Sequence, residues 1–466
     1  MKKFLKITAA IVLLLLICYF GFFKYRQIRA NNVSIPISTN ALLKINVDEL
    51  YKTIAVSYIK HPNQYSGSDK KGIKEKVDDL NTGLKIPANI YLYSLKGKAK
   101  TTFFSSFEIA DTLVFNHFIQ KKSSLPLIKK DSNFFQSKDS TFFILFNKIT
   151  VAFAYTPQKE QVKTTLVEIL NRKNMIKVGE SRFKQLVNLS DHISFQNTGN
   201  FSKINFTDGK ISFSNEFINQ MIVPAAKPQH RVLNPESTVS MWLNGKFKSD
   251  LIKKNQTVSP SLLSKDSFFR FYKDYVDFEW TNTITQVDTV VGYEYNDDFE
   301  RVEKKVLQDR KIPSISMNLA ANDQEVSDYL KSLGALDQPT GKISSSMIPL
   351  YQVYFKGNSG SIQLSTVQSA KPDLKRISSD DFFYFKVDFK KLIKQTPIPL
   401  IADKLGTFSQ LEIKAKSTGK DKIKLESELL FLNKDANALI QLLKVFKNGF
   451  NRSINFNFSV DIPVTK

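Results

Sequence analysis

Apolar and polar positions along the chain follow two rhythms, one typical of strands and one typical of amphipathic helices. Four segments place an apolar strand directly before a helix-like pattern. Three of these helices are expected to begin after Asp111, after Thr156 with Pro157 at the first helical position, and after Asn322, and the fourth follows the strand-like run at 425–432. The recurrence predicts repeated ββα-like units.

A strict alternation of apolar and charged residues over 411–426 predicts a β-hairpin with its turn at 417–420. Leu411, Ile413 and Ala415 fall on one face, and charged residues fall on the other. A hairpin with one buried and one solvent-exposed face is typical of an antiparallel sheet that helices cover on one side. The expected fold class is α+β, with an N-terminal transmembrane helix followed by mixed, mainly antiparallel sheets with helices on one face.

A chain of 466 residues is long for a single hydrophobic core. Two similar segments, at 41–48 and 381–388, each consist of a predicted strand followed by the start of a predicted helix, and they indicate an internal duplication. The Pro-containing stretch 223–235 lies between the two halves. We therefore expect three parts, namely a basic start with a transmembrane anchor at 1–30, a first α+β unit at 31–235 and a second α+β unit at 236–466.

Residues 7–23 carry no charge, and a helix of this length reaches about 26 Å, enough to cross a bilayer core. We expect this segment to span the inner membrane. A cleaved signal peptide is the alternative. However, the apolar run is longer than the usual apolar region of a signal peptide, and the small residue that could form a cleavage site, Ala30, lies among basic residues. Basic residues flank both ends of the span, and a short basic N-terminus that stays cytosolic would place the ectodomain in the periplasm.

The formal charge is +23, and six basic residues before residue 31 leave +17 for the ectodomain. This excess favours an anionic lipid, a glycan or an envelope protein as partner. Nucleic acid is disfavoured, because the sequence has no helix-turn-helix, zinc-finger or RNA-binding signature. The best candidate contact surface is one face of the predicted hairpin, with a solvated, aggregation-resistant face as the alternative; its residues are Lys414, Lys416, Lys422 and Lys424.

The sequence holds no reactive constellation, and we expect no cofactor, no metal and no catalytic residue. The single cysteine, Cys18, lies in the apolar segment, so residues 31–466 can form neither a disulfide nor a thiolate metal site. The four histidines are widely spaced, without a paired-ligand pattern. The densest acidic group, at 294–303, contains ordinary turn chemistry and basic neighbours that neutralise it.

The short basic start, the single span, the Phe-, Lys- and Asn-rich ectodomain and the phrase Leu42–Leu50 resemble uncharacterised single-span envelope proteins of Bacteroidetes-type bacteria. The resemblance implies an envelope location. It also implies that the Asp-Ser/Thr triplets at 111–113, 139–141 and 288–290 are O-glycosylation acceptors. The opening residues 1–17 resemble AsmA-like bridging proteins, although those are dominated by repetitive β-structure.

These features predict a membrane-anchored envelope protein with a binding or scaffolding ectodomain and no enzymatic activity. The alternative is lipid or hydrophobic-ligand handling between membranes, and an enzyme that the motifs do not reveal comes third. A continuous apolar groove would favour lipid handling, and a pocket where distant carboxylates meet a histidine would favour an enzyme.

Overall fold

A computed structural model describes most of the chain, in the ranges 25–65, 81–122, 127–131, 133–248, 270–295, 299–368, 375–396, 405–419 and 421–450. Within these ranges, no helix is long and apolar enough to cross a membrane. The transmembrane segment predicted at 7–23 lies outside them. The fold class is α+β, and all strand pairs described below are antiparallel.

The chain divides into two compact units. Unit 1 comprises Met1–Asn215 together with Asn433–Lys466, and unit 2 comprises Glu216–Leu432. The expected split at 235/236 therefore differs from the observed one in two ways, since unit 2 begins earlier and the C-terminal segment belongs to unit 1. The start of helix α11 (Ala438–Phe450) is tied to unit 1, because the Asn437 side chain donates to the Phe206 carbonyl at 3.2 Å.

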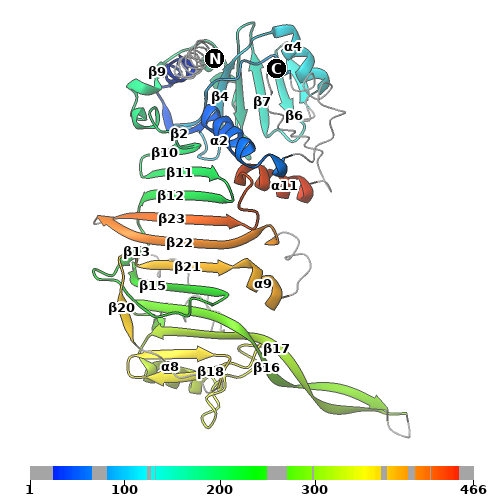
Figure 1. Cartoon of the computed structure of the whole chain (residues 1–466), viewed down its shortest axis with the longest axis vertical. Coiled ribbons are helices and arrows are strands. Elements are labelled where there is room, and N and C mark those ends of the chain that lie inside the picture. The colour runs from blue at the N-terminus through cyan, green and yellow to red at the C-terminus, as the bar shows by residue number, and fades with distance from the viewer. Residues whose placement is uncertain are drawn as a thin grey trace, which may run out of the picture. The chain divides into compact units, whose positions relative to one another are not determined.

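Unit 1 contains a sheet of nine strands in the order β5-β6-β7-β8-β4-β3-β2-β10-β11 (Figure 1). Their bounds are β5 (Leu127–Asp131), β6 (Phe134–Ser137), β7 (Phe142–Phe146), β8 (Thr150–Tyr155), β4 (Phe103–Glu108), β3 (Asn89–Leu95), β2 (Thr39–Asn46), β10 (Ile193–Gln196) and β11 (Asn200–Thr207). The chain then passes into unit 2 within β12 (Lys210–Ile218).

Unit 2 contains a sheet of eight strands in the order β18-β19-β17-β16-β15-β21-β22-β23. Their bounds are β18 (Tyr354–Asn358), β19 (Ser361–Ser365), β17 (Arg301–Ala320), β16 (Tyr275–Tyr295), β15 (Val239–Phe247), β21 (Phe383–Asp388), β22 (Phe408–Gly419) and β23 (Lys422–Phe431). The short strand β13 (Ile222–Pro224) pairs with β15. The predicted hairpin at 411–426 is confirmed as β22–β23.

Seven strands follow the same order in both units. The order β7-β8-β4-β3-β2-β10-β11 in unit 1 matches β18-β19-β17-β16-β15-β21-β22 in unit 2, and the strands also occur in the same succession along the chain. This repeat is larger than the ββα unit expected from the sequence. The segments at 41–48 and 381–388 lie on β2 and β21, which are not equivalent strands, so their similarity does not mark the repeat.

Several helices begin where the sequence predicts. The side chain of Asp111 accepts hydrogen bonds from the first turn of α4 (Thr112–His117), and Asn322 does so for α8 (Asp323–Ser332). The start of α5 (Lys163–Leu170) was expected near Thr156 and lies later. The buried Thr156 hydroxyl accepts from Thr102 at 2.9 Å and from the Gln158 amide at 3.3 Å, and it donates to the Gln158 carbonyl. Asn46 caps α2 (Val47–Lys60), and Asp388 caps α9 (Phe389–Gln395).

The remaining elements are short. Strands β1 (Ser34–Pro36) and β9 (Met175–Lys177) form one two-stranded ribbon, and β14 (Gln229–Arg231) and β20 (Arg376–Ser378) form another. A π-helical turn, η3 (Phe118–Lys122), continues α4, and the described residues also include three 3-10 turns, η1 (Pro62–Gln64), η4 (Val178–Glu180) and η5 (Lys184–Leu186).

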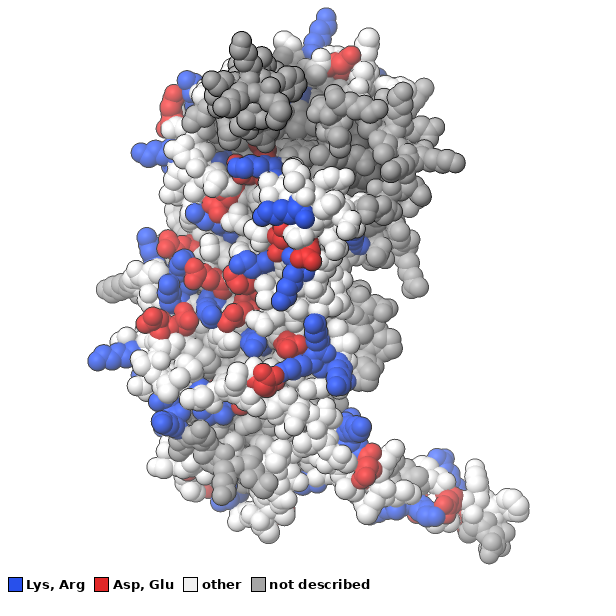
Figure 2. All heavy atoms as spheres, viewed as in Figure 1, with Lys and Arg blue, Asp and Glu red and all other residues white. Residues whose placement is uncertain are grey.

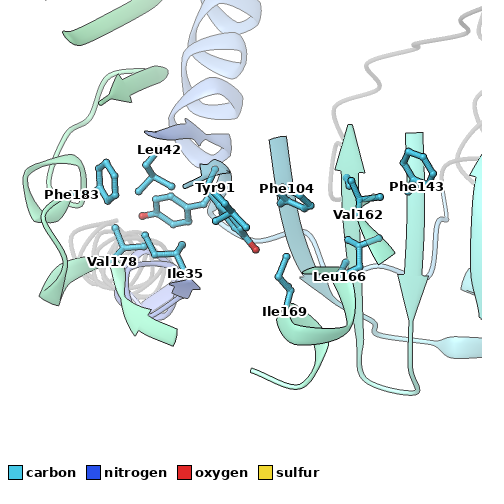
Figure 3. Packing of buried hydrophobic residues seen from close by; sticks show 14 of the residues in the cluster. Ile35, Leu42, Tyr91, Phe104, Phe143, Val162, Leu166, Ile169, Val178 and Phe183 are labelled. Atoms are coloured by element: carbon cyan, nitrogen blue, oxygen red, sulfur yellow. The ribbon is translucent and has the colours of Figure 1, made fainter. Parts of the chain in front are cut away.

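The sheet of unit 1 is apolar on both faces, and helices pack on both, rather than on one as expected. On β8, Val151 belongs to the core under α4, whereas Ala152 and Ala154 belong to the core under α5. Figure 3 shows Leu166 and Ile169 of α5 within the second of these cores. A strand with apolar residues at consecutive positions requires cover on both sides, which explains the second helix layer.

The sheet of unit 2 has one apolar and one polar face. Leu243, Val276 and Leu319 come from three neighbouring strands and pack under α8, which contributes Val326 and Leu330. The opposite face carries buried polar and aromatic residues, which the β14–β20 ribbon contacts; they are Trp242, Tyr275, Asp277, Glu279 and Asn318.

Candidate functional site

The hairpin β16–β17 is much longer than its counterpart in the repeat. Its strands have 21 and 20 residues, whereas the equivalent strands β3 and β4 have 7 and 6. We call the outer part, residues 285–295 and 301–311, the arm. Figure 1 shows it extending beyond the other strands of unit 2.

The arm leaves the sheet at a firmly held root. The Gln286 side chain donates to the carbonyls of Gln352 and Thr366, each at 2.8 Å, and Gln352 donates to the Val287 carbonyl at 2.8 Å. On β17, Ile312 lies opposite Ile284 and is buried, whereas every residue from 301 to 311 is exposed. The arm is therefore a two-stranded ribbon in solvent attached to a rigid base.

Large apolar side chains lie exposed along the arm and beside its turn. Leu307 is 73% exposed, Tyr295 71% and Phe299 85%. Val302 and Val306 are about half exposed on the other face of the ribbon. Burying one large apolar side chain contributes about 1.5–3 kcal/mol, so a group of exposed ones is typical of a surface that a partner covers.

The two edges of the arm differ in charge. Residues 301–311 on β17 include five basic and two acidic residues, whereas residues 285–295 on β16 include two acidic residues and no lysine, arginine or proline; the basic five are Arg301, Lys304, Lys305, Arg310 and Lys311. Lysine and proline are the residues by which natural edge strands avoid unwanted pairing. Beyond Trp280, β16 pairs with β17 alone among the described strands. Residues 301–313 of β17 likewise pair with β16 alone among the described strands. Both edges of the arm therefore lack a strand partner, and the β16 edge is the one without lysine, arginine or proline.

The acidic group predicted at 294–303 lies at the far end of this arm. Glu294 forms an ion pair with Lys304 on the opposite strand at 2.6 Å, and Arg301 stacks on the Tyr293 ring at 3.6 Å. Asp297 and Asp298 lie outside the described residues. No group of residues that could hold a metal ion occurs within the described ranges.

The four predicted contact lysines lie on one face of β22–β23, but acids share that face. Lys416 faces Lys424 across the hairpin, and Lys414 faces Glu426. Two ion pairs tie the face together, Lys414–Glu412 at 2.9 Å and Lys424–Glu426 at 2.6 Å. The hydrogen bond from Glu412 raises the pKa of Lys414.

Figure 2 shows acidic and basic side chains intermixed over these two strands. With Lys422 and the acids Glu412, Glu426 and Glu428, the face has four positive and three negative side chains. In the sequence these three acids already stand at the charged positions that alternate with apolar ones, so the mixed charge of the face could have been predicted. Contact with an anionic partner here stays a prediction, and it concerns a surface of nearly balanced charge.

A buried lysine is a feature that the sequence reasoning missed. Lys44 on β2 is 1% exposed, and its ammonium group donates to the carbonyls of Leu186, Val187 and Leu189 at 3.1, 3.0 and 2.8 Å. Burial lowers its pKa to about 8, against the opposing charge of Asp191. Because all three donors are used inside the protein, Lys44 fastens the 186–189 segment rather than serving as a reactive amine. Side chains alternate between the two faces of a strand, and this alternation places Lys44 on the buried face of β2. That position in the sequence pattern could have indicated a buried lysine.

A second buried polar cluster fixes the β14–β20 ribbon to unit 2. Arg231 pairs with Asp277 and with Glu279, each at 3.1 Å, and Asp277 is fully buried. Asn318 donates to Asp277 at 2.9 Å, and Ser237 donates to Glu279 at 2.7 Å. One arginine holds two carboxylates, and neutral donors also bind both of them, which is the arrangement of a structural charge cluster.

His192 and His230 make contacts within the fold. The ring of His192 bonds Thr53 at 2.8 Å and accepts from the Phe206 amide at 2.8 Å, and burial lowers its pKa. His230 stacks on Trp242 with a centroid distance of 4.5 Å.

A cleft of about 440 Å³ lies in unit 1 beside α5. Its apolar residues alternate with charged ones, and the lining includes Ile37, Leu95, Lys96, Glu168 and Lys173. Such a lining can hold a small amphipathic molecule, but it is not the continuous apolar groove that lipid handling would require.

The chain has little measurable similarity to known proteins. No protein-family model and no curated protein matches it. Among solved structures, crystal form I of TP0453 aligns with a TM-score of 0.22 and 9% identity over 74% of this chain and 94% of that one. Crystal form III of TP0453 gives a TM-score of 0.22 and 9% identity over 71% and 92%. A similarity this low supports no statement about fold or function.

Proposed function

We propose that the protein is a binding or scaffolding component of a cell envelope, anchored through residues 7–23, and that its arm holds another protein. The observation that carries this proposal is the difference in length between equivalent hairpins. In unit 1 the equivalent strands β3 and β4 have only 7 and 6 residues and still take their places in the shared strand order. The additional residues of β16 and β17 are therefore not needed to form a sheet with this strand order.

The physical chemistry of the arm supports a binding role. An isolated two-stranded ribbon is only marginally stable in water, because neither of its faces is covered. This one also exposes Leu307 and Tyr295, which favours association with a surface that removes them from water. A ribbon that served only as a turn would be shorter and more polar.

The test is cross-linked capture of partners by the full-length protein in its own membranes. In the shortened variant, residues 287–309 are replaced by Asn-Gly, which suits a two-residue hairpin turn and keeps Gln286 and Arg310 opposite each other. We expect the shortened protein to keep its melting temperature and to lose the cross-linked partners. A matched control replaces Lys414, Lys416, Lys422 and Lys424 with Gln. Undiminished capture by the shortened variant would contradict the proposal.

Lipid or hydrophobic-ligand handling remains the alternative. Extraction of a tightly bound lipid from the purified protein, unaffected by shortening the arm, would favour it. The mixed lining of the unit 1 cleft gives it no specific support.

A further inference from the structure

We propose that the free β16 edge of the arm pairs with the same edge of a second copy of this chain. The two arms would run antiparallel and form a four-stranded sheet, β17-β16-β16-β17, about a two-fold axis. This inference rests on the proposed binding role of the arm and names its partner. The pairing is isologous, so it closes on two copies and leaves the β17 edges outside.

The choice of edge follows from composition. Between 285 and 295, β16 is rich in threonine, valine and tyrosine, the residue types that favour strands, and Asp288 and Glu294 are its charged residues. Residues 301–311 of β17 carry a net charge of +3, so two copies of this edge would repel each other. Self-association therefore favours the β16 edge over the β17 edge.

A self-complementary register exists on this edge. When position 290 lies opposite position 290, Asp288 faces position 292, a glycine, and Glu294 faces the partner's Gln286. The same register places Val287 opposite the partner's Tyr293, a pairing of a β-branched with an aromatic residue that stabilises antiparallel sheets. A register centred on 291 would instead oppose Asp288 and Glu294, which is unfavourable. The edge thus has a register in which no two like charges meet.

Charges on the outer strands complement this register. Arg310 lies opposite Gln286 within one arm. In the paired sheet, Glu294 and the partner's Arg310 would therefore share one row of the same face, two strands apart. Lys304 lies opposite Gly292 within its own arm. In the paired sheet Gly292 would face the partner's Asp288, so Lys304 and that aspartate would lie in one row with only a glycine between them. Within each arm Glu294 already pairs with Lys304 at 2.6 Å and Asp288 with Arg310 at 3.5 Å, so the contact between copies would extend these pairs into one network.

The first test is disulfide trapping in the full-length protein in membranes, with Cys18→Ser as background. Directly opposed antiparallel residues have Cα atoms about 4.5–5.5 Å apart, within the range a disulfide spans. Mild oxidation should cross-link most of the Val290→Cys protein into a dimer. The matched control, Gln308→Cys on β17, should remain monomeric.

The second test measures the dimer dissociation constant in detergent by light scattering. Val290→Lys places a lysine directly opposite its own copy in this register and opposite Val306 within the arm, and it should raise the constant about tenfold, because directly opposed like charges repel. Gln308→Lys adds the same charge to β17 and should change it less than about twofold.

A wild-type protein that stays monomeric at all concentrations, with equal cross-linking at 290 and 308, would overturn the self-pairing. If the shortened arm nevertheless loses its cross-linked partners, the binding role stands and the partner is another protein. Retention of those partners together with a monomeric wild type would remove both proposals.

Discussion

Units 1 and 2 arrange seven equivalent strands in the same order and differ in what is added to them. Unit 1 widens its sheet with β5 and β6 and covers both faces with apolar helices. Unit 2 lengthens one hairpin into the arm and keeps one face polar under the β14–β20 ribbon. The shared strand order thus specifies a sheet, and the additions distinguish a well-buried unit from one that presents an exposed surface.

The units also stabilise buried charge in different ways. Unit 1 places Lys44 against three backbone carbonyls, whereas unit 2 pairs Arg231 with Asp277 and Glu279. The ammonium group of Lys44 contacts carbonyl oxygens and no carboxylate. Its pKa is therefore sensitive to burial, because no direct ion pair opposes the shift. An ion pair is sensitive to the loss of either partner. The following predictions test this contrast, beginning with the largest effect.

Arg231→Met should destabilise the protein by about 3–5 kcal/mol, because it leaves two buried carboxylates, Asp277 and Glu279, without their positive partner. Urea unfolding of the full chain measures the effect. The control, Asp288→Ala, breaks the more exposed ion pair with Arg310 and should cost less than about 1 kcal/mol. Equal losses in the two variants would show that the cluster is not a buried ion pair in solution.

Lys44→Met should destabilise the protein by about 2 kcal/mol at neutral pH, because three carbonyls lose their donor. The variant should also change the pH dependence. Burial lowers the folded-state pKa of Lys44 from 10.5 to about 8, so the unfolded chain binds more protons between these values. The free energy of unfolding of the wild type should therefore rise between about pH 8 and 10.5, and this contribution is lost as the pH falls through 8.

Unfolding titrations across that pH window measure this second effect. The Lys44→Met protein should show a flatter rise than the wild type, and the exposed-lysine control Lys129→Met should retain the wild-type slope. Identical slopes in all three proteins would mean that Lys44 stays charged throughout the window.

The helix caps should give the smallest difference between the units. Asp111 accepts from two amides of α4, Leu113 at 2.9 Å and Val114 at 3.0 Å, whereas Asn322 accepts from the Glu325 amide of α8 at 3.4 Å. We expect Asp111→Ala to cost about 1 kcal/mol and Asn322→Ala less. Thermal unfolding compares the two, and a larger loss for Asn322→Ala would reverse the ranking.

Local patterns predicted the local structures. Capping by Asp111 and Asn322 and the β22–β23 hairpin depend on residues near in sequence, and they are confirmed. The arm was missed because strand alternation reflects one buried and one exposed face, and a ribbon exposed on both faces has no reason to alternate. The role of Lys44 depends on carbonyls more than 140 residues away, which no local pattern contains.

The division of the chain also has a consequence for synthesis. Unit 1 is built from two separated stretches, and Asn437 reaches back to Phe206 and Tyr65, 231 and 372 residues earlier. As the chain is made from its N-terminus, the whole of unit 2 must emerge before α11 can dock on its own unit. A chain that stops at Leu432 would therefore hold a finished second unit beside an incomplete first one, although every strand of the unit 1 sheet described above would have been translated.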